Sequence, residues 1–147
     1  MVYFVPILIV AISAFLIYLA GAMRKCIYPS VQGQPPNWVF SVVWPILYVL
    51  LAWAGERIWR CKNITSRVVF VLLLSMLVLW PFVQWYWCSS SFSLIIILFS
   101  LVLSIGLLAI MVPQDYVSSI LLLPLVLWLS YASLLNWRVS KQDISRV

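Results

Sequence analysis

The chain has 147 residues, of which 66% are hydrophobic and only 8% carry a charge. Soluble domains carry about 25% charged residues, so this chain has too little polar surface to cover a water-soluble globule. The formal net charge is +6, but the basic residues stand where apolar runs break, as membrane-flanking anchors do. This placement excludes nucleic-acid binding, which needs a basic stripe with interleaved polar side chains.

Five apolar segments have the length that a helix needs to cross a hydrocarbon core of about 30 Å. We expect one all-α membrane domain over residues 1–147, a five-helix bundle with spans at residues 3–23, 38–59, 68–88, 92–112 and 116–138. An odd number of spans places the two termini on opposite sides of the membrane. The basic residues of the connections divide five to four between the two sides, which favours a cytoplasmic C-terminus by one residue.

Several kinds of chemistry lack candidate residues. Histidine is absent and Cys26, Cys61 and Cys88 form no CxxC pair, so the spacing of metal ligands is missing. Because an odd number of cysteines gives no disulfide framework, we interpret all three as small apolar or interfacial thiols. Charged residues within the predicted spans stand only at their ends, as Glu56 does at a span exit, which argues against ion-coupled transport. No nucleophile has a base partner for hydrolysis.

Aromatic residues are the most informative feature, since nine tryptophans are many for this length. Trp44 and Tyr48 lie four residues apart, so a helix places them on one face. Trp80, Gln84 and Trp87 follow at i, i+4 and i+7, which predicts one face of the third span. These rings either fill the bundle core or line a cavity. Gln84 either bonds a neighbouring helix or meets a ligand.

The fifth span carries a similar stripe. Its members fall at i, i+4, i+7 and i+8: Trp128, Ala132, Leu135 and Asn136. Together with the other aromatic faces they could line an apolar cavity with a few amides and hydroxyls, which suits a flat hydrophobic ligand such as a porphyrin or a sterol. The fourth span lacks aromatic or amide groups suited to a site, so we expect it to act as scaffold or in helix–helix contact.

Residues 24–37 form the longest connection of the chain, in which Gly33, Pro35 and Pro36 prevent a helix. Long connections without secondary structure of their own are often functional loops. This one leads directly into the helix that carries Trp44. We therefore expect it to be a lid over the cavity.

Three stretches resemble motifs of a known family. Residues 35–48 are close to the pattern PPxWxF…W…LY, and residues 84–92 resemble N-W-x-W…FF. Residues 123–136 follow the same family's order of proline, tryptophan, alanine and leucine-asparagine. Over nearly its whole length the chain is thus similar to the translocator proteins, also called tryptophan-rich sensory proteins or peripheral-type benzodiazepine receptors (TspO/MBR).

The resemblance implies a five-helix bundle whose pocket is closed by the first loop. Members of the family bind tetrapyrroles, cholesterol and benzodiazepine-type drugs, and are commonly dimers. It therefore implies a homodimer among membrane lipids, in a mitochondrial outer or a bacterial-type membrane, with a porphyrin or haem-type tetrapyrrole as ligand and no required cofactor.

The resemblance also implies site residues. By position, the pocket residues are Trp44, Trp87, Trp128, Ala132, Leu135 and Asn136. The helical faces described above add Tyr48 and Gln84, and the lid comprises Tyr28, Pro35 and Pro36.

The chain departs from the family pattern at two positions. Gln84 replaces an asparagine and Trp137 replaces a tyrosine, and no tyrosine has the spacing of the vertebrate-type cholesterol motif. Two other functions stay open. One is a porphyrin-degrading enzyme in which Trp44 and Trp128 take part. The other is a structural or regulatory interaction protein without a ligand.

Overall fold

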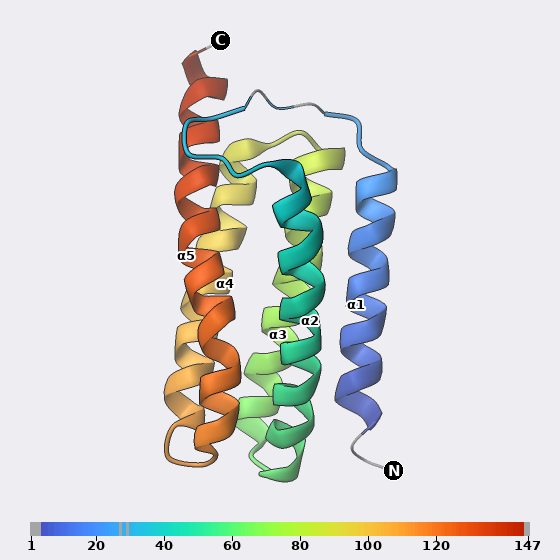
Figure 1. The fold of residues 1–147 in the computed structure, drawn as a ribbon, viewed down its shortest axis with the longest axis vertical. Helices are drawn as coiled ribbons and strands as arrows, with labels where there is room; N and C mark the ends of the chain where they lie inside the picture. The colour runs from blue at the N-terminus through green and yellow to red at the C-terminus, as the bar shows by residue number, and fades with distance from the viewer. Residues whose placement is uncertain (1–3, 27, 29, 146–147) are drawn as a thin grey trace.

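The computed structural model describes residues 4–26, 28 and 30–145, with side chains described as far as Gln142. In this part of the chain five helices are long and apolar enough to cross a membrane, which confirms the expected all-α fold. The elements are α1 (Phe4–Ala22), α2 (Asn37–Arg60), α3 (Ile64–Pro81), the π-helix η1 (Phe82–Tyr86) that continues α3, α4 (Ser90–Met111) and α5 (Tyr116–Ser145) (Figure 1).

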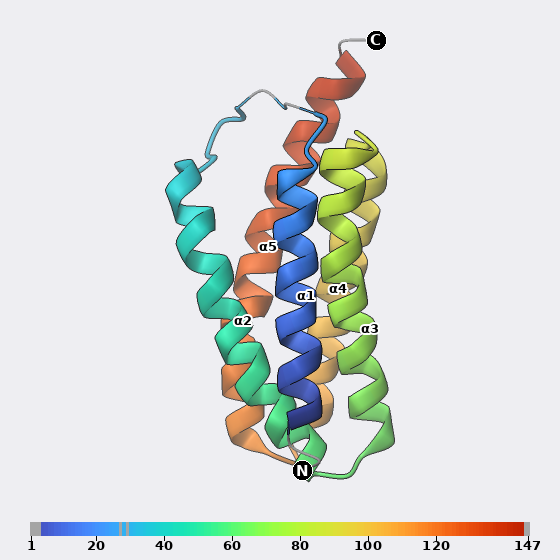
Figure 2. The same cartoon turned by 90° about the vertical axis from the view of Figure 1, so that its right-hand side faces the viewer.

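The helices pack as a ring in the order α1, α2, α5, α4, α3 and back to α1. The described residues of the connection between α1 and α2, which are 23–26, 28 and 30–36, lie at one end of the bundle together with the turn between η1 and α4. We call this end the loop end (Figures 1 and 2). Residues 61–63 and 112–115 lie at the other end, called here the turn end. Consequently α1 begins at the turn end and α5 ends at the loop end.

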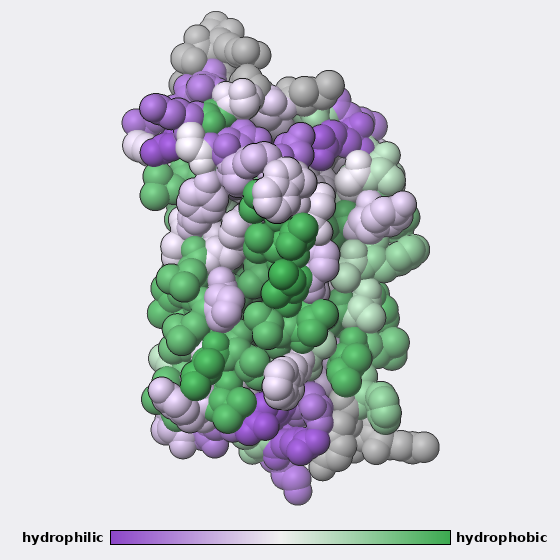
Figure 3. Space-filling model, viewed as in Figure 1, coloured by the Kyte–Doolittle hydropathy of each residue, from purple (hydrophilic) through white to green (hydrophobic). Residues whose placement is uncertain are grey.

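The surface has the layering of a membrane protein. Hydrophobic side chains form a band across the middle of the bundle, and hydrophilic ones collect at both ends (Figure 3). Large apolar side chains are exposed on this surface, for example Val49 at 68% and Leu127 at 70%. Such exposure would be unfavourable in water. Such a band between two polar rims fits a hydrocarbon layer. The chain is a multi-pass membrane protein.

Two helix boundaries differ from the expected ones because of capping and polarity. The Asn63 side chain accepts hydrogen bonds from the backbone N–H groups of Thr65 (2.9 Å) and Ser66 (3.3 Å). This cap starts α3 at Ile64, four residues before the predicted span. At the other end of the chain, α5 continues to Ser145, because a helix that leaves the apolar layer needs no apolar residues to continue.

The third span changes its helical period after Pro81. Proline has no N–H to donate to the preceding turn, and the chain continues as η1, in which the N–H of Trp87 bonds the carbonyl of Phe82 five residues earlier (3.1 Å). The wider turn alters which side chains share a face. Gln84 is 6% exposed, whereas Trp87 is 63% exposed. The prediction that both lie on one inward face is therefore wrong.

An ion pair at the turn end joins α2 to the start of α5. Arg57 donates to both carboxylate oxygens of Asp115, from Nε to Oδ2 (2.7 Å) and from Nη2 to Oδ1 (2.8 Å). Asp115 also accepts from the N–H and hydroxyl of Ser118 in the first turn of α5. The hydrogen bonds from Arg57 hold the pKa of Asp115 well below its ordinary value. A surface pair, Glu56 with Arg60, lies nearby.

We predict that Asp115→Asn lowers the stability at pH 7 by about 1 kcal/mol, because it removes the charge but keeps the cap. Since the pKa of Asp115 is depressed in the folded state, its contribution is complete above about pH 4 and decreases as the pH falls below that value. Thermal unfolding in detergent at pH 7 and pH 3 measures both effects. The matched control is Glu56→Gln, which removes an exposed pair and should change stability by less than about 0.5 kcal/mol. Equal effects of the two substitutions would contradict the prediction.

Candidate functional site

Four aromatic rings from three helices meet in the half of the bundle nearer the loop end. Trp44 stacks on Tyr48 within α2, with ring centroids 6.0 Å apart, and on Trp80 of α3 at 6.3 Å. The ring of Trp128, from α5, meets Trp44 edge-on at 6.3 Å. These contacts are within the range in which aromatic pairs stabilise each other. We call Trp44, Tyr48, Trp80 and Trp128 the ring cluster.

A buried group of polar side chains lies next to the ring cluster. The hydroxyl of Ser93, from α4, contacts Oε1 of Gln84 and Oδ1 of Asn136, the latter at 3.2 Å. The indole N–H of Trp80 also reaches Oδ1 of Asn136, at 3.4 Å. We call Gln84, Ser93 and Asn136 the polar cluster. Trp80 thus belongs to the ring cluster and bonds the polar cluster, so the two form one continuous interior site.

Two buried hydrogen-bonding groups of the ring cluster have no partner in the part of the chain that the structure describes. They are the hydroxyl of Tyr48 and the indole N–H of Trp128. A buried donor without an acceptor costs about 1–3 kcal/mol, and no water reaches it within a hydrocarbon layer. Two such donors beside stacked rings indicate a place where an acceptor from outside the chain would be favourable.

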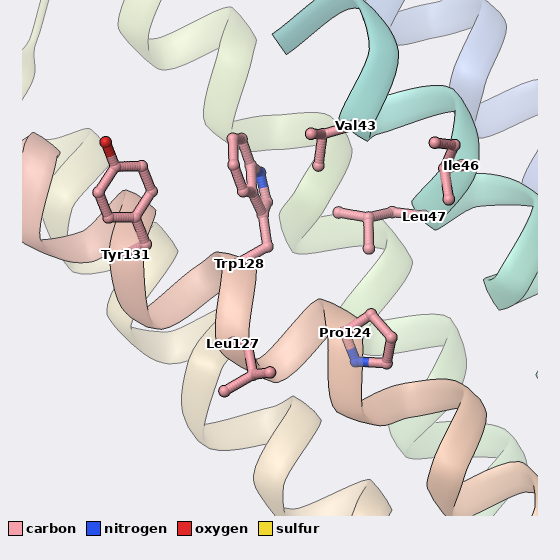
Figure 4. Close-up of a pocket in the computed structure, with 7 residues that line it drawn as sticks. All are labelled: Val43, Ile46, Leu47, Pro124, Leu127, Trp128 and Tyr131. Atoms are coloured by element: carbon pink, nitrogen blue, oxygen red, sulfur yellow. The ribbon is translucent and has the colours of Figure 1, made fainter. Parts of the chain in front are cut away.

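An apolar groove of about 400 Å³ lies between α2 and α5 (Figure 4). Its lining contains one ring of the ring cluster, Trp128, whose indole nitrogen lies on the side of the ring that faces α2 (Figure 4). The groove is open toward lipid, because Ile46 and Leu127 on its rim are 54% and 70% exposed. Its residues are Val43, Ile46, Leu47, Pro124, Leu127, Trp128 and Tyr131. A lipophilic molecule can therefore reach Trp128 from within the bilayer.

The structure brings most of the predicted site residues together. The stripe of the fifth span faces the interior as predicted, and Ala132 and Leu135 are buried beside Asn136. The predicted residues that belong to the two clusters are Trp44, Tyr48, Gln84, Trp128 and Asn136. Trp87 is separate from them, because its side chain faces outward after η1. Whether any of these residues binds a ligand stays a prediction.

Two members of the site were not among the predicted residues. The sequence contains a signal for Trp80, since its helical spacing places it on one face with Gln84. Ser93 had none, because one serine in an aliphatic span looks like any other. The fourth span makes the helix–helix contact expected of it, through a hydroxyl of α4 that lies between the two amide oxygens.

The connection at residues 23–36 runs across the loop end and is tied down on the η1 side. The N–H groups of Lys25 and Cys26 both bond the carbonyl of Trp85, at 2.9 and 3.2 Å. A disulfide joins Cys26 to Cys88, with Cα atoms 5.7 Å apart. The interpretation of all three cysteines as thiols is therefore wrong, and only Cys61 is free. The pair is 62 residues apart in sequence, so only the fold reveals it.

The same connection is held on the α5 side. The hydroxyl of Tyr131 donates to the carbonyl of Gly33, and the guanidinium of Arg138 donates to the carbonyl of Gln32. Gly33 has φ 84°, and a Cβ there would lie 2.7 Å from Nη1 of Arg138, so only glycine fits. Of the predicted lid residues, Tyr28 and Pro35 are partly buried and Pro36 is exposed. The loop is therefore held at two points, and we call it the strap; its role as a lid stays a prediction.

A comparison with family models matches the TspO/MBR family over residues 3–142, which include α1 to α4 and most of α5. No curated protein matches the sequence of the chain.

We predict that Ser93→Ala destabilises the bundle by about 1 kcal/mol, because it removes the hydroxyl that joins two buried amides. Ser100→Ala is the matched control, since Ser100 is equally buried on α4 but donates only to the carbonyl of Ile96 in its own helix (2.9 Å). Thermal melting in detergent compares the two variants. If Ser100→Ala costs as much as Ser93→Ala, the polar cluster has no special role in stability.

Proposed function

The chain belongs to the TspO/MBR family, and we propose that it is a translocator- or sensor-type protein that binds porphyrins within the membrane. Other flat lipophilic molecules, such as sterols or benzodiazepine-type drugs, belong to the same chemical class of ligand. The observation that carries the proposal is the ring cluster with its two unpartnered donors, Tyr48 Oη and Trp128 Nε1.

The chemistry of the ring cluster suits a flat conjugated ligand. Indole and phenol rings offer large faces for stacking, and each buries its area at low conformational cost. The unpartnered donors would pair with an acceptor, such as a porphyrin carboxylate or a drug carbonyl. A pocket that combines mostly apolar walls with a few placed polar groups is typical of small-molecule sites.

Binding requires a rearrangement of the ring cluster. Its ring centroids lie 6.0 to 6.3 Å apart, which leaves no room for a macrocycle between two rings. A ligand would first lie in the groove against Trp128 and would then separate α2 from α5. The groove volume of about 400 Å³ is within the usual range of small-molecule sites, about 300–1,000 Å³.

The proposal is tested by titrating protoporphyrin into the protein in lipid nanodiscs and following tryptophan fluorescence. Saturable quenching at one site supports the binding function. Light-dependent bleaching of the bound pigment to a defined product would identify the protein as a porphyrin-degrading enzyme instead. Absence of saturable quenching would contradict the proposal and favour an interaction protein without a ligand.

We predict that Trp128→Phe weakens porphyrin binding by about 1 kcal/mol, roughly tenfold in Kd, because it removes stacking area and an indole donor. The matched control is Trp137→Phe on the same helix, which changes an exposed indole and should leave Kd unchanged. A second variant, Asn136→Leu, should also weaken binding, by less than Trp128→Phe. Wild-type affinity in both well-folded variants would overturn the site assignment.

We also predict that replacing Pro35 and Pro36 with glycine speeds porphyrin release several-fold, because glycine loosens the chain between the strap and α2. Stopped-flow measurement of the dissociation rate tests this, with circular dichroism as the check that helix content is kept. An unchanged dissociation rate would remove the role of this connection as a lid.

A further inference from the structure

In the described part of the chain, the Cys26–Cys88 disulfide is the covalent cross-link between the strap and the turn after η1. It joins the strap to the turn between η1 and α4. Cys88 is exposed and Cys26 is partly exposed, so reagents in water can reach both sulfurs. Exposed disulfides are the ones that exchange readily, in contrast to those buried in a core.

The backbone at Cys88 has a conformation that the disulfide helps to hold. Its φ is 58°, in the left-handed region that is unfavourable for a residue with a Cβ. Once the sulfur is released, Cys88 is free to leave this conformation. The turn that fixes the end of η1 then loses one of its constraints.

The sequence around Cys26 favours exchange. Arg24 and Lys25 directly precede it, and these cations attract an incoming thiolate, which is the form of a thiol that attacks a disulfide. Both side chains are themselves placed over rings near η1, Arg24 over Trp85 at 4.9 Å and Lys25 over Tyr86 at 3.9 Å. These cations therefore stay near the Cys26 backbone.

A chain of contacts connects the disulfide to the interior. The carbonyl of Trp85 accepts the N–H groups of Lys25 and Cys26, and the Trp85 ring packs edge-on against Trp80 at 6.0 Å. Trp80 in turn stacks on Trp44 of the ring cluster at 6.3 Å. Any movement of η1 that follows release of the strap is therefore transmitted to the ring cluster.

We propose that the Cys26–Cys88 disulfide is a redox-operated latch that fastens the strap over the loop end. An external dithiol opens it. One thiolate attacks a sulfur of the pair, which forms a mixed disulfide and releases the other cysteine as a thiolate. The second thiolate of the dithiol then attacks the mixed disulfide and releases the remaining cysteine. The dithiol is oxidised to its own disulfide, and its two protons pass to the thiols of Cys26 and Cys88. The released strap keeps its hydrogen bonds to Trp85 and α5 and the contacts of Arg24 and Lys25 with the rings of η1. Faster ligand exchange in the reduced state rests on the proposed function, whereas release of the strap does not.

The experiment uses the full chain carrying Cys61→Ser in nanodiscs, so that the latch contains the only cysteines. Maleimide mass-tagging counts free thiols before and after dithiothreitol, without denaturant. Hydrogen exchange then compares residues 30–36 between the two states, with residues 61–63 at the turn end as the internal control. The double variant Cys26→Ser, Cys88→Ser represents the open state in both conditions.

We expect two thiols to become reactive in the folded protein, and the strap amides to exchange at least tenfold faster while residues 61–63 stay unchanged. The double variant should match the reduced protein with or without dithiothreitol. A disulfide that resists reduction until denaturant is added would overturn the latch, as would equal exchange of the strap in both states.

Porphyrin dissociation is measured on the same samples, and the reduced protein should release the ligand several-fold faster. An equal dissociation rate in the two states would overturn the coupling of the latch to the ring cluster. If neither state binds porphyrin, the proposed function fails, while tagging and hydrogen exchange still decide whether the latch exists.

Discussion

The structure depends on one constraint, which is that a hydrocarbon layer offers no water to a polar group. Most polar side chains in the spans obey it by bonding their own helix, as Ser100 does with Ile96 O and Ser133 does with Leu129 O. The polar cluster obeys it by joining three helices. Some buried donors depart from this pattern, such as the Ser119 hydroxyl of α5, and among them Tyr48 and Trp128 lie together where the rings meet. The same constraint that builds the bundle therefore also marks the candidate site.

The contact between α2 and α5 is fastened at both ends and loose between them. At the turn end, Arg57 and Asp115 join the two helices directly. At the loop end, Tyr131 and Arg138 of α5 hold the strap that leads into α2. Between these points lies the groove, whose lining is apolar apart from the Tyr131 hydroxyl at its loop end and the indole N–H of Trp128. Two helices pinned at their ends can separate in the middle at low cost, which is what entry of a flat molecule from the bilayer requires.

Much of this was predictable because lipid makes length and hydropathy decisive. The five spans follow from apolar runs, and the stripe from Trp128 to Asn136 faces inward because α5 is a regular α-helix there. Trp87 was misplaced because η1 changes the helical period after Pro81, and a 3.6-residue pattern cannot anticipate a π-helix. The disulfide and Ser93 could not be found at all, since each depends on a contact between segments that are distant in sequence.

The Asn63 cap and the disulfide lie at opposite ends of the bundle, and a membrane separates those ends. Asn63-Ile64-Thr65 is an acceptor sequence for N-linked glycans, which are attached in the same oxidising lumen where disulfides form. Only one end of a single inserted chain can face that lumen. Where one end of the bundle faces such a lumen, the chain therefore carries either a disulfide formed there or a glycan at Asn63, and not both.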